Sequence, residues 1–178
     1  SVSVVIISSI LLFLFLNKIL FNWGLILISS ILIFLAFNLS LFGNKKKIFL
    51  GDHGSTGLGH IVAWNLIYLS QEKDLITPVS ALFFIFVPLT DTLLTIIKRV
   101  RSSKSIFHPD RKHMHHFLSD IGFSDRAILI IIIVVSIVAG CIAVVSNFFN
   151  IQEYYVLYGY FTALVFMGIL GYSRPTKD

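Results

Sequence analysis

The sequence predicts an all-α fold: a polytopic membrane helix bundle of about six transmembrane helices, with a short interfacial helix on its cytoplasmic side. Of the 178 residues, 56% are hydrophobic and only 13% are charged, whereas roughly a quarter of the residues of a soluble domain are charged. The apolar residues also gather in runs long enough to cross a bilayer. These observations exclude an ordinary soluble domain, and the single cysteine, Cys141, excludes an intrachain disulfide.

Six apolar segments are candidates for crossing about 30 Å of hydrocarbon, since a helix rises about 1.5 Å per residue. By residue number they are 2–16, 23–42, 55–70, 75–97, 127–149 and 154–171. The third contains Gly57, Gly59, His60 and Asn65, which suits a helix packed inside a bundle better than one that faces lipid. No internal repeat is visible, so residues 1–178 are expected to form a single membrane domain.

Six spans place the connecting segments alternately on the two sides of the membrane, and the basic residues are strongly biased to one side. Of the 14 lysines and arginines, only Lys18 and Lys73 fall on the other side. The positive-inside rule places the basic side in the cytoplasm. The cytoplasmic segments are then 43–54 and 98–126, and they hold five of the six histidines. We therefore expect any chemistry at the cytoplasmic face.

The first cytoplasmic segment holds a carboxylate, Asp52, between Gly51 and Gly54. Mg²⁺ is typically bound by one or two carboxylates and completes its shell with water and substrate phosphate, so Asp52 is a candidate ligand. Ser55 lies where it would cap the following helix, whose first N–H groups favour an anion. The alternative is a glycine turn in which Asp52 is only a solvated cap, and these residues alone favour that alternative.

The second cytoplasmic segment carries a dense group of titratable side chains: Asp110, Arg111, His113, His115 and His116. Pro109 and Gly122 suit the start and the end of a short amphipathic helix on the membrane surface. On a regular helix His113 and His115 lie about 160° apart, so such a helix cannot direct all three histidines to one atom. Metal ligation and phosphate contact both remain open, against the alternative that these histidines merely avoid the apolar face.

One carboxylate, Asp91, lies inside the fourth apolar segment. A charge inside a membrane is costly, which makes Asp91 a functional candidate. The alternative is that Asp91 pairs with a buried arginine or lysine and orients the second cytoplasmic segment. The sequence favours neither.

Three blocks of the sequence resemble one known family. They are residues 49–56 (FLGDHGST), 88–91 (PLTD) and 107–116 (FHPDRKHMHH). These blocks and their spacing are similar to the polyprenyl-phosphate N-acetylhexosamine-1-phosphate transferases, most of all to the WecA type, which uses UDP-N-acetylglucosamine and undecaprenyl phosphate. The resemblance is strongest from about residue 38 to residue 126.

The resemblance implies an enzyme that transfers N-acetylhexosamine 1-phosphate from a UDP-sugar to undecaprenyl phosphate, with Mg²⁺ or Mn²⁺. The sugar implied is N-acetylglucosamine. The family works in the bacterial cytoplasmic (inner) membrane as a multi-pass protein whose active face is cytoplasmic. Its product starts the synthesis of O-antigen, common antigen or wall polysaccharide.

The resemblance also assigns roles to residues of this chain. Asp52 matches the aspartate associated with the metal, and His113, His115 and His116 match the catalytic histidine motif. Arg111 lies beside that motif, and we expect these last four residues at the diphosphate. The candidates for substrate binding are Arg111, Asp110, Ser55 and Asp91.

The sequence departs from the family in one large respect. The family also has a D-D-x-x-D block and an N-x-x-D-G-x-D-G block, both upstream, and neither occurs in these 178 residues. We therefore expect this chain to be the C-terminal half of a longer transferase, to need the missing N-terminal half as its partner, and to be inactive and poorly stable alone.

Two other functions are compatible with the residues alone. A transporter would use Asp91 and the histidines as a proton relay, although the non-cytoplasmic half of the predicted bundle is almost wholly apolar. A non-catalytic membrane subunit would use its basic loop to bind a partner or anionic lipid. We exclude nucleic acid as a partner, because the aromatic residues lie in the apolar segments and the basic residues flank those segments.

Overall fold

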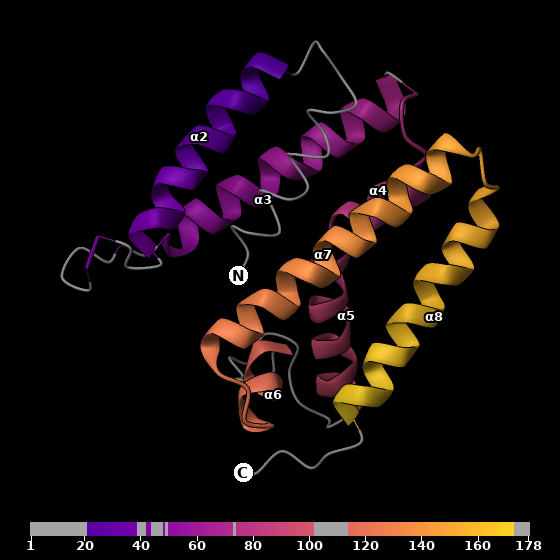
Figure 1. Ribbon diagram of the computed structural model, residues 1–178. Coiled ribbons are helices and arrows are strands. Elements are labelled where there is room, and N and C mark those ends of the chain that lie inside the picture. Colours follow the sequence, from indigo (N-terminus) through magenta and orange to yellow (C-terminus); the bar gives the residue numbers. More distant parts are fainter. Residues whose placement is uncertain are drawn as a thin grey trace.

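The computed structural model describes residues 21–38, 42–43, 48, 50–72, 74–101 and 114–172. All regular structure in these ranges is helical, which confirms the all-α class (Figure 1). The elements are α2 (Phe21–Asn38), α3 (Gly51–Ile67), the π-helical turn η2 (Tyr68–Glu72), α4 (Pro78–Phe84), α5 (Phe86–Arg101), α6 (Met114–Asp120), α7 (Asp125–Phe148) and α8 (Glu153–Tyr172).

Four of the predicted spans correspond to helices of the structure. Segment 23–42 contains most of α2, and segment 55–70 contains most of α3 and part of η2. Segments 127–149 and 154–171 match α7 and α8. The first predicted span, 2–16, lies outside the described residues. Among those residues only α7 is long and apolar enough to cross a membrane alone, with a second span if α4 and α5 count as one. The six-span arrangement therefore stays a prediction.

The fourth predicted span is not one continuous helix. The structure divides it into α4 and α5, which are bent by 87°, so the expectation of a single helix over 75–97 was wrong. The cause is Pro88, which has no N–H to donate and whose ring would clash with the carbonyl of Phe84 four residues earlier. The helix ends at Phe84, and α5 starts again at Phe86, which places Pro88 in its first turn.

Helix α7 forms the centre of the packing, in contact with α4, α5 and α6, while α8 packs on α4 and α5 (Figure 1). The buried positions of α7 recur at helical spacing, which defines one face of the helix. They are Ile128, Ile132, Ser136, Ala139, Gly140, Ala143 and Ser146. The small residues in the C-terminal half of this list allow another helix to approach closely. The short α4 makes the most extensive contact with α7.

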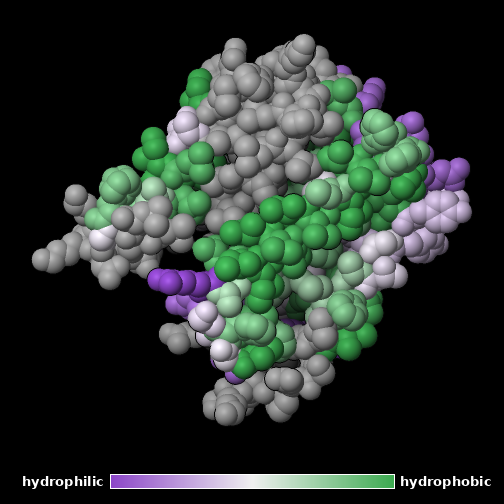
Figure 2. Space-filling view, viewed as in Figure 1, coloured by the Kyte–Doolittle hydropathy of each residue, from purple (hydrophilic) through white to green (hydrophobic). Residues whose placement is uncertain are grey.

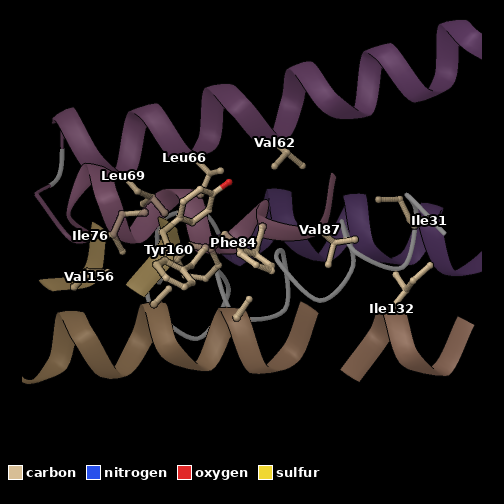
Figure 3. Close-up of a cluster of buried hydrophobic side chains, with 14 of the residues drawn as sticks. Ile31, Val62, Leu66, Leu69, Ile76, Phe84, Val87, Ile132, Val156 and Tyr160 are labelled. Atoms are coloured by element: carbon tan, nitrogen blue, oxygen red, sulfur yellow. The ribbon is translucent and has the colours of Figure 1, made fainter. Parts of the chain in front are cut away.

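An aromatic cluster joins α4, α5 and α8 within the core (Figure 3). The ring of Tyr160 stands edge-on to Phe83 and Phe86, with ring centroids 5.6 Å and 5.4 Å apart. Edge-to-face geometry at this distance is favourable for aromatic pairs. The cluster fixes α8 against the bend between α4 and α5.

The outer faces of α7 and α8 carry many large apolar side chains, and Figure 2 shows the face of α7 as a broad green area, with α8 paler in part. Exposed side chains there include Ile130, Val134, Phe161 and Phe166, each more than half exposed. Soluble monomers rarely expose apolar patches of such extent. Buried serines and threonines inside and large aliphatic groups outside are the arrangement expected of helices surrounded by lipid. The surface supports the predicted membrane location.

Candidate active site

The segment around Asp52 is helical, since α3 begins at Gly51. Gly51 adopts φ +68°, a left-handed conformation that glycine adopts without strain and that turns the chain into the helix. Asp52 is therefore the second residue of α3, while its side chain lies outside what the structure describes. Residues 51–54, predicted as part of a loop, instead form the first turn of this helix.

Ser55 does not cap α3, so that expectation was wrong. The helix starts four residues before Ser55, and Leu50 occupies the N-cap position without a side-chain cap. The prediction assumed that the chain would enter the helix after the second glycine, but the left-handed turn is made at the first one, Gly51. Ser55 lies half-buried within the helix. Whether it contacts substrate stays a prediction.

Because α3 begins at Gly51, His53 and His60 lie on the same face of this helix, a relation that was not predicted from the sequence. His53, Thr56, Gly57 and His60 recur at intervals of three and four residues and together line a shallow depression on one face of α3. The ring of His60 also stands edge-on to Trp64, with centroids 6.1 Å apart. A spacing of seven residues places two side chains on the same face of a helix, so the sequence could have predicted that these histidines lie together. The prediction was missed because residues 43–54 were assigned to a loop.

The carboxylate of Asp91 contacts the helix that carries the histidine motif. Its Oδ1 atom accepts a hydrogen bond of 2.7 Å from the backbone N–H of Met114, the first residue of α6. Both residues are half-buried. The sequence had left open whether Asp91 is functional or orients the second segment through an arginine or lysine. The observed contact joins Asp91 to a backbone N–H of α6, and whether Asp91 also contacts substrate stays a prediction.

Helix α6 ends as the sequence predicts. Gly122 has φ +104°, and its N–H donates to the carbonyl of Ser119 at 2.9 Å, which closes the helix. Ser124 then caps α7, because its hydroxyl accepts from the N–H of Ala127 at 3.3 Å. The helix that was expected from Pro109 is described only as Met114–Asp120.

The other members of the predicted site are only partly placed. His115 lies exposed on α6. Asp110, Arg111, His113 and the side chain of His116 lie outside the described residues, so the structure does not test whether the histidines meet Asp52. Within the described ranges, no group of three or more histidine, cysteine or acidic side chains could hold a metal ion.

The donor chemistry of the chain nevertheless fits a hard divalent cation that is bound only in part by protein. Asp52 offers a carboxylate at the start of α3, and Mg²⁺ commonly takes one or two carboxylates and fills its remaining positions with water and phosphate oxygen. Asp52 would then be the residue of this chain that holds the cation. The remaining ligands would come from the substrate and from other carboxylates.

Comparison with known proteins gives several sequence relatives that share one name. The chain is 39% identical over 121 residues to the undecaprenyl-phosphate alpha-N-acetylglucosaminyl 1-phosphate transferase of Haemophilus influenzae, covering 67% of this chain and 34% of that protein. Proteins of the same name from Pasteurella multocida and Escherichia coli K12 are 35% identical over 137 residues and 33% identical over 130 residues. These two matches cover 76% and 72% of this chain, and 38% and 35% of those proteins.

The match is confined to part of each relative. The chain spans about a third of the length of the curated relatives that it matches, and the matched region is their C-terminal part. No protein-family model matches the chain, and no solved structure matches it.

Proposed function

Since the chain is a homologue of the C-terminal part of the undecaprenyl-phosphate alpha-N-acetylglucosaminyl 1-phosphate transferases, we propose that it forms the C-terminal part of such an enzyme. The relatives confirm the family that the three sequence blocks predicted. The single observation that carries the proposal is the 39% identity over 121 residues to the Haemophilus influenzae transferase.

The proposed reaction is the transfer of N-acetylglucosamine 1-phosphate from UDP-N-acetylglucosamine to undecaprenyl phosphate. An oxygen of the lipid phosphate attacks the phosphorus that carries the sugar, the bond to the UMP oxygen breaks, and UMP leaves. The products are undecaprenyl diphosphate N-acetylglucosamine and UMP. Such a reaction needs mainly positioning and stabilisation of the charge that spreads over the phosphoryl oxygens.

The residues of this chain have distinct tasks in the proposed site. Asp52 would hold Mg²⁺ or Mn²⁺, which when bound neutralises phosphate charge. His113, His115, His116 and Arg111 would donate hydrogen bonds to the diphosphate. We keep Asp110 and Ser55 as candidates for substrate binding. The aspartates missing from this chain would come from the N-terminal part of the enzyme, so the chain alone would be inactive.

The location of the proposed site follows from its acceptor. Undecaprenyl phosphate is a membrane lipid and UDP-sugars are cytoplasmic, so the reaction requires a bilayer surface that faces the cytoplasm. The apolar outer faces of α7 and α8 support a membrane location. We therefore place the protein in the bacterial inner membrane, as a multi-pass protein that starts O-antigen, common-antigen or wall-polymer synthesis.

A transfer assay tests the proposal. Membranes from a strain without its own transferase would carry this chain together with the N-terminal part of the Haemophilus influenzae relative, or this chain alone. Radioactive UDP-N-acetylglucosamine should label the lipid fraction only when both parts are present, and chelation of divalent cations should abolish labelling until Mg²⁺ is added back.

Variants of the active protein then test the site. Asp52→Asn should lower labelling by about 100-fold or more, since the removal of one electrostatic stabiliser typically has that effect. Asp74→Asn is the matched control, because Asp74 is exposed in the connection between η2 and α4 and belongs to no proposed site. Full activity of Asp52→Asn would contradict the proposed site, and labelling of another lipid class would contradict the proposed acceptor.

A further inference from the structure

The hydrogen bond between Asp91 and Met114 joins two helices at the edge of the histidine motif. The two residues are 23 positions apart in sequence, and Oδ1 of Asp91 lies 2.7 Å from the backbone nitrogen of Met114. His113 directly precedes Met114 in the sequence, and His115 directly follows it. A contact at Met114 therefore acts on the backbone between two members of the motif.

The bonded N–H group is one that a helix cannot satisfy by itself. Met114 is the first described residue of α6, and its N–H bonds outside the helix, as the first N–H groups of a helix do because they have no acceptor within it. A carboxylate that accepts from such an N–H makes a charge-assisted hydrogen bond, which is about twice as strong as a neutral one. Asp91 thus provides, from α5, the acceptor for the first described N–H of α6.

The apolar side of α6 supplies a second anchor. Met114 and Leu118, one helical turn apart, pack against the buried core, and α6 also packs on α7. A helix of seven residues is not stable in isolation, so its position depends on these tertiary contacts. His115 lies between the two anchored positions and remains exposed. The position of its backbone is therefore set by the contacts on either side of it.

We propose that Asp91 is a positioning residue for the histidine motif: its carboxylate holds the N–H of Met114 and so sets the position of the backbone that carries His115. This inference rests on the proposed function, because the histidines need positioning only in a working transferase. Under this proposal Asp91 acts through α6 and not by contact with substrate. A substrate-binding or metal-binding carboxylate must keep its charge, whereas a hydrogen-bond acceptor need only keep its oxygen.

Two substitutions separate these roles. Asp91→Asn keeps an Oδ1 acceptor and removes the charge, whereas Asp91→Ala removes both. For a positioning residue, Asp91→Ala should lower kcat roughly 100-fold, the loss typical of a small displacement of reacting groups. Asp91→Asn should stay within about tenfold of the unmodified enzyme, because a neutral hydrogen bond is weaker but still present. The KM for the UDP-sugar should change little in either variant.

The matched control is Thr92→Val. Thr92 is the next residue of α5, and its hydroxyl donates only within its own helix, to the Pro88 carbonyl at 2.8 Å. This variant should leave both kcat and KM unchanged. An Asp91→Asn enzyme as inactive as Asp91→Ala, or an Asp91→Ala enzyme whose defect lies in KM, would overturn the proposal in favour of direct contact with substrate or metal.

A direct measurement of the contact does not depend on enzyme activity. The chain has only two methionines, Met114 and Met167. Selective ¹⁵N-methionine labelling of the whole chain in lipid nanodiscs therefore gives one amide signal at the contact and one in α8 as an internal reference. A Met114→Leu variant assigns the two signals.

The expected result is specific to one signal. Asp91→Ala should speed hydrogen exchange of the Met114 amide at least tenfold and leave Met167 unchanged, while Asp91→Asn and Thr92→Val should have much smaller effects. Unchanged exchange at Met114 in Asp91→Ala would overturn the inference. If the assembled protein transfers no sugar phosphate while Met114 responds as expected, the proposed function fails and the structural contact stands.

Discussion

Asn147 Oδ1 accepts a hydrogen bond of 3.2 Å from the backbone N–H of Thr77, which joins the end of α7 to the start of α4. The amide nitrogen of Asn147 donates to the Leu75 carbonyl. One turn away, the hydroxyls of Ser80 and Ser146 lie 3.0 Å apart, and both side chains are buried. This polar network holds the short helix α4 on α7, and α4 leads directly into the bend.

The network predicts a strong effect of Asn147→Ala. The substitution leaves the Thr77 N–H and the Leu75 carbonyl without their shared partner, and unsatisfied groups cost about 1–3 kcal/mol each. We expect a lower midpoint of thermal unfolding in mild detergent, followed by tyrosine and tryptophan fluorescence. Thr162→Val is the control, since its hydroxyl bonds only to the Gly159 carbonyl within α8. Equal midpoints for Asn147→Ala and the control would show that the network contributes nothing.

The small residues on the buried face of α7 predict a steric effect. Ala143 is fully buried, on the face of α7 that packs on α4. Ala143→Leu adds atoms for which the interface has no space, and such overpacking costs about 1–3 kcal/mol. The adjacent Ile142 is 44% exposed, so Ile142→Leu should leave the unfolding midpoint unchanged. An Ala143→Leu chain as stable as the control would mean that α4 does not approach α7 closely.

The last two apolar runs of the sequence predicted their helices to within two residues at each end. The predicted spans 127–149 and 154–171 became Asp125–Phe148 and Glu153–Tyr172. Hydropathy suffices there because an apolar run of this length has few alternatives to a helix, and local signals such as Gly122 and Ser124 mark the boundaries. The prediction of six spans also assumes that each apolar segment crosses the membrane, and hydropathy alone does not test this assumption.

Two features of the structure were not predicted from the sequence, for different physical reasons. Hydropathy did not predict the bend at Ile85, because the apolar run continues through it. Pro88, one turn later, was the residue that indicated a break in the helix. The contact between Asp91 and Met114 carried no such signal, since it joins residues 23 positions apart through tertiary packing. Periodicity identifies a helix and its faces, but it does not identify which side chain of one helix meets the end of another.

Pro88 predicts a change of shape that can be measured as a distance. Pro88→Ala restores an N–H group and removes the clash with the Phe84 carbonyl, which lowers the cost of a continuous helix by about 3 kcal/mol. Spin labels at positions 78 and 97, in a Cys141→Ala background, would be about 28 Å apart along a straight helix and nearer 20 Å across the 87° bend. We expect the shorter distance in the parent chain and an added longer population in Pro88→Ala.

The first label replaces Pro78 in both samples, so the parent measurement already includes the loss of one proline. Pro78 is the first residue of α4, where the missing N–H is harmless, so its loss should leave the shorter distance unchanged. A single short distance in Pro88→Ala would show that the aromatic cluster of Phe83, Phe86 and Tyr160 suffices to keep the bend.

We expect the substitution His115→Ala to lower transferase activity without lowering the stability of the chain. The side chain is exposed on α6 between the anchored positions Met114 and Leu118, so its removal should leave the unfolding midpoint within experimental error. If its imidazole stabilises the diphosphate during transfer, His115→Ala should lower kcat by about 100-fold in the assembled transferase. Ser119→Ala, an exposed position one turn later, should affect neither quantity. Unchanged kcat in His115→Ala would remove this histidine from the proposed site.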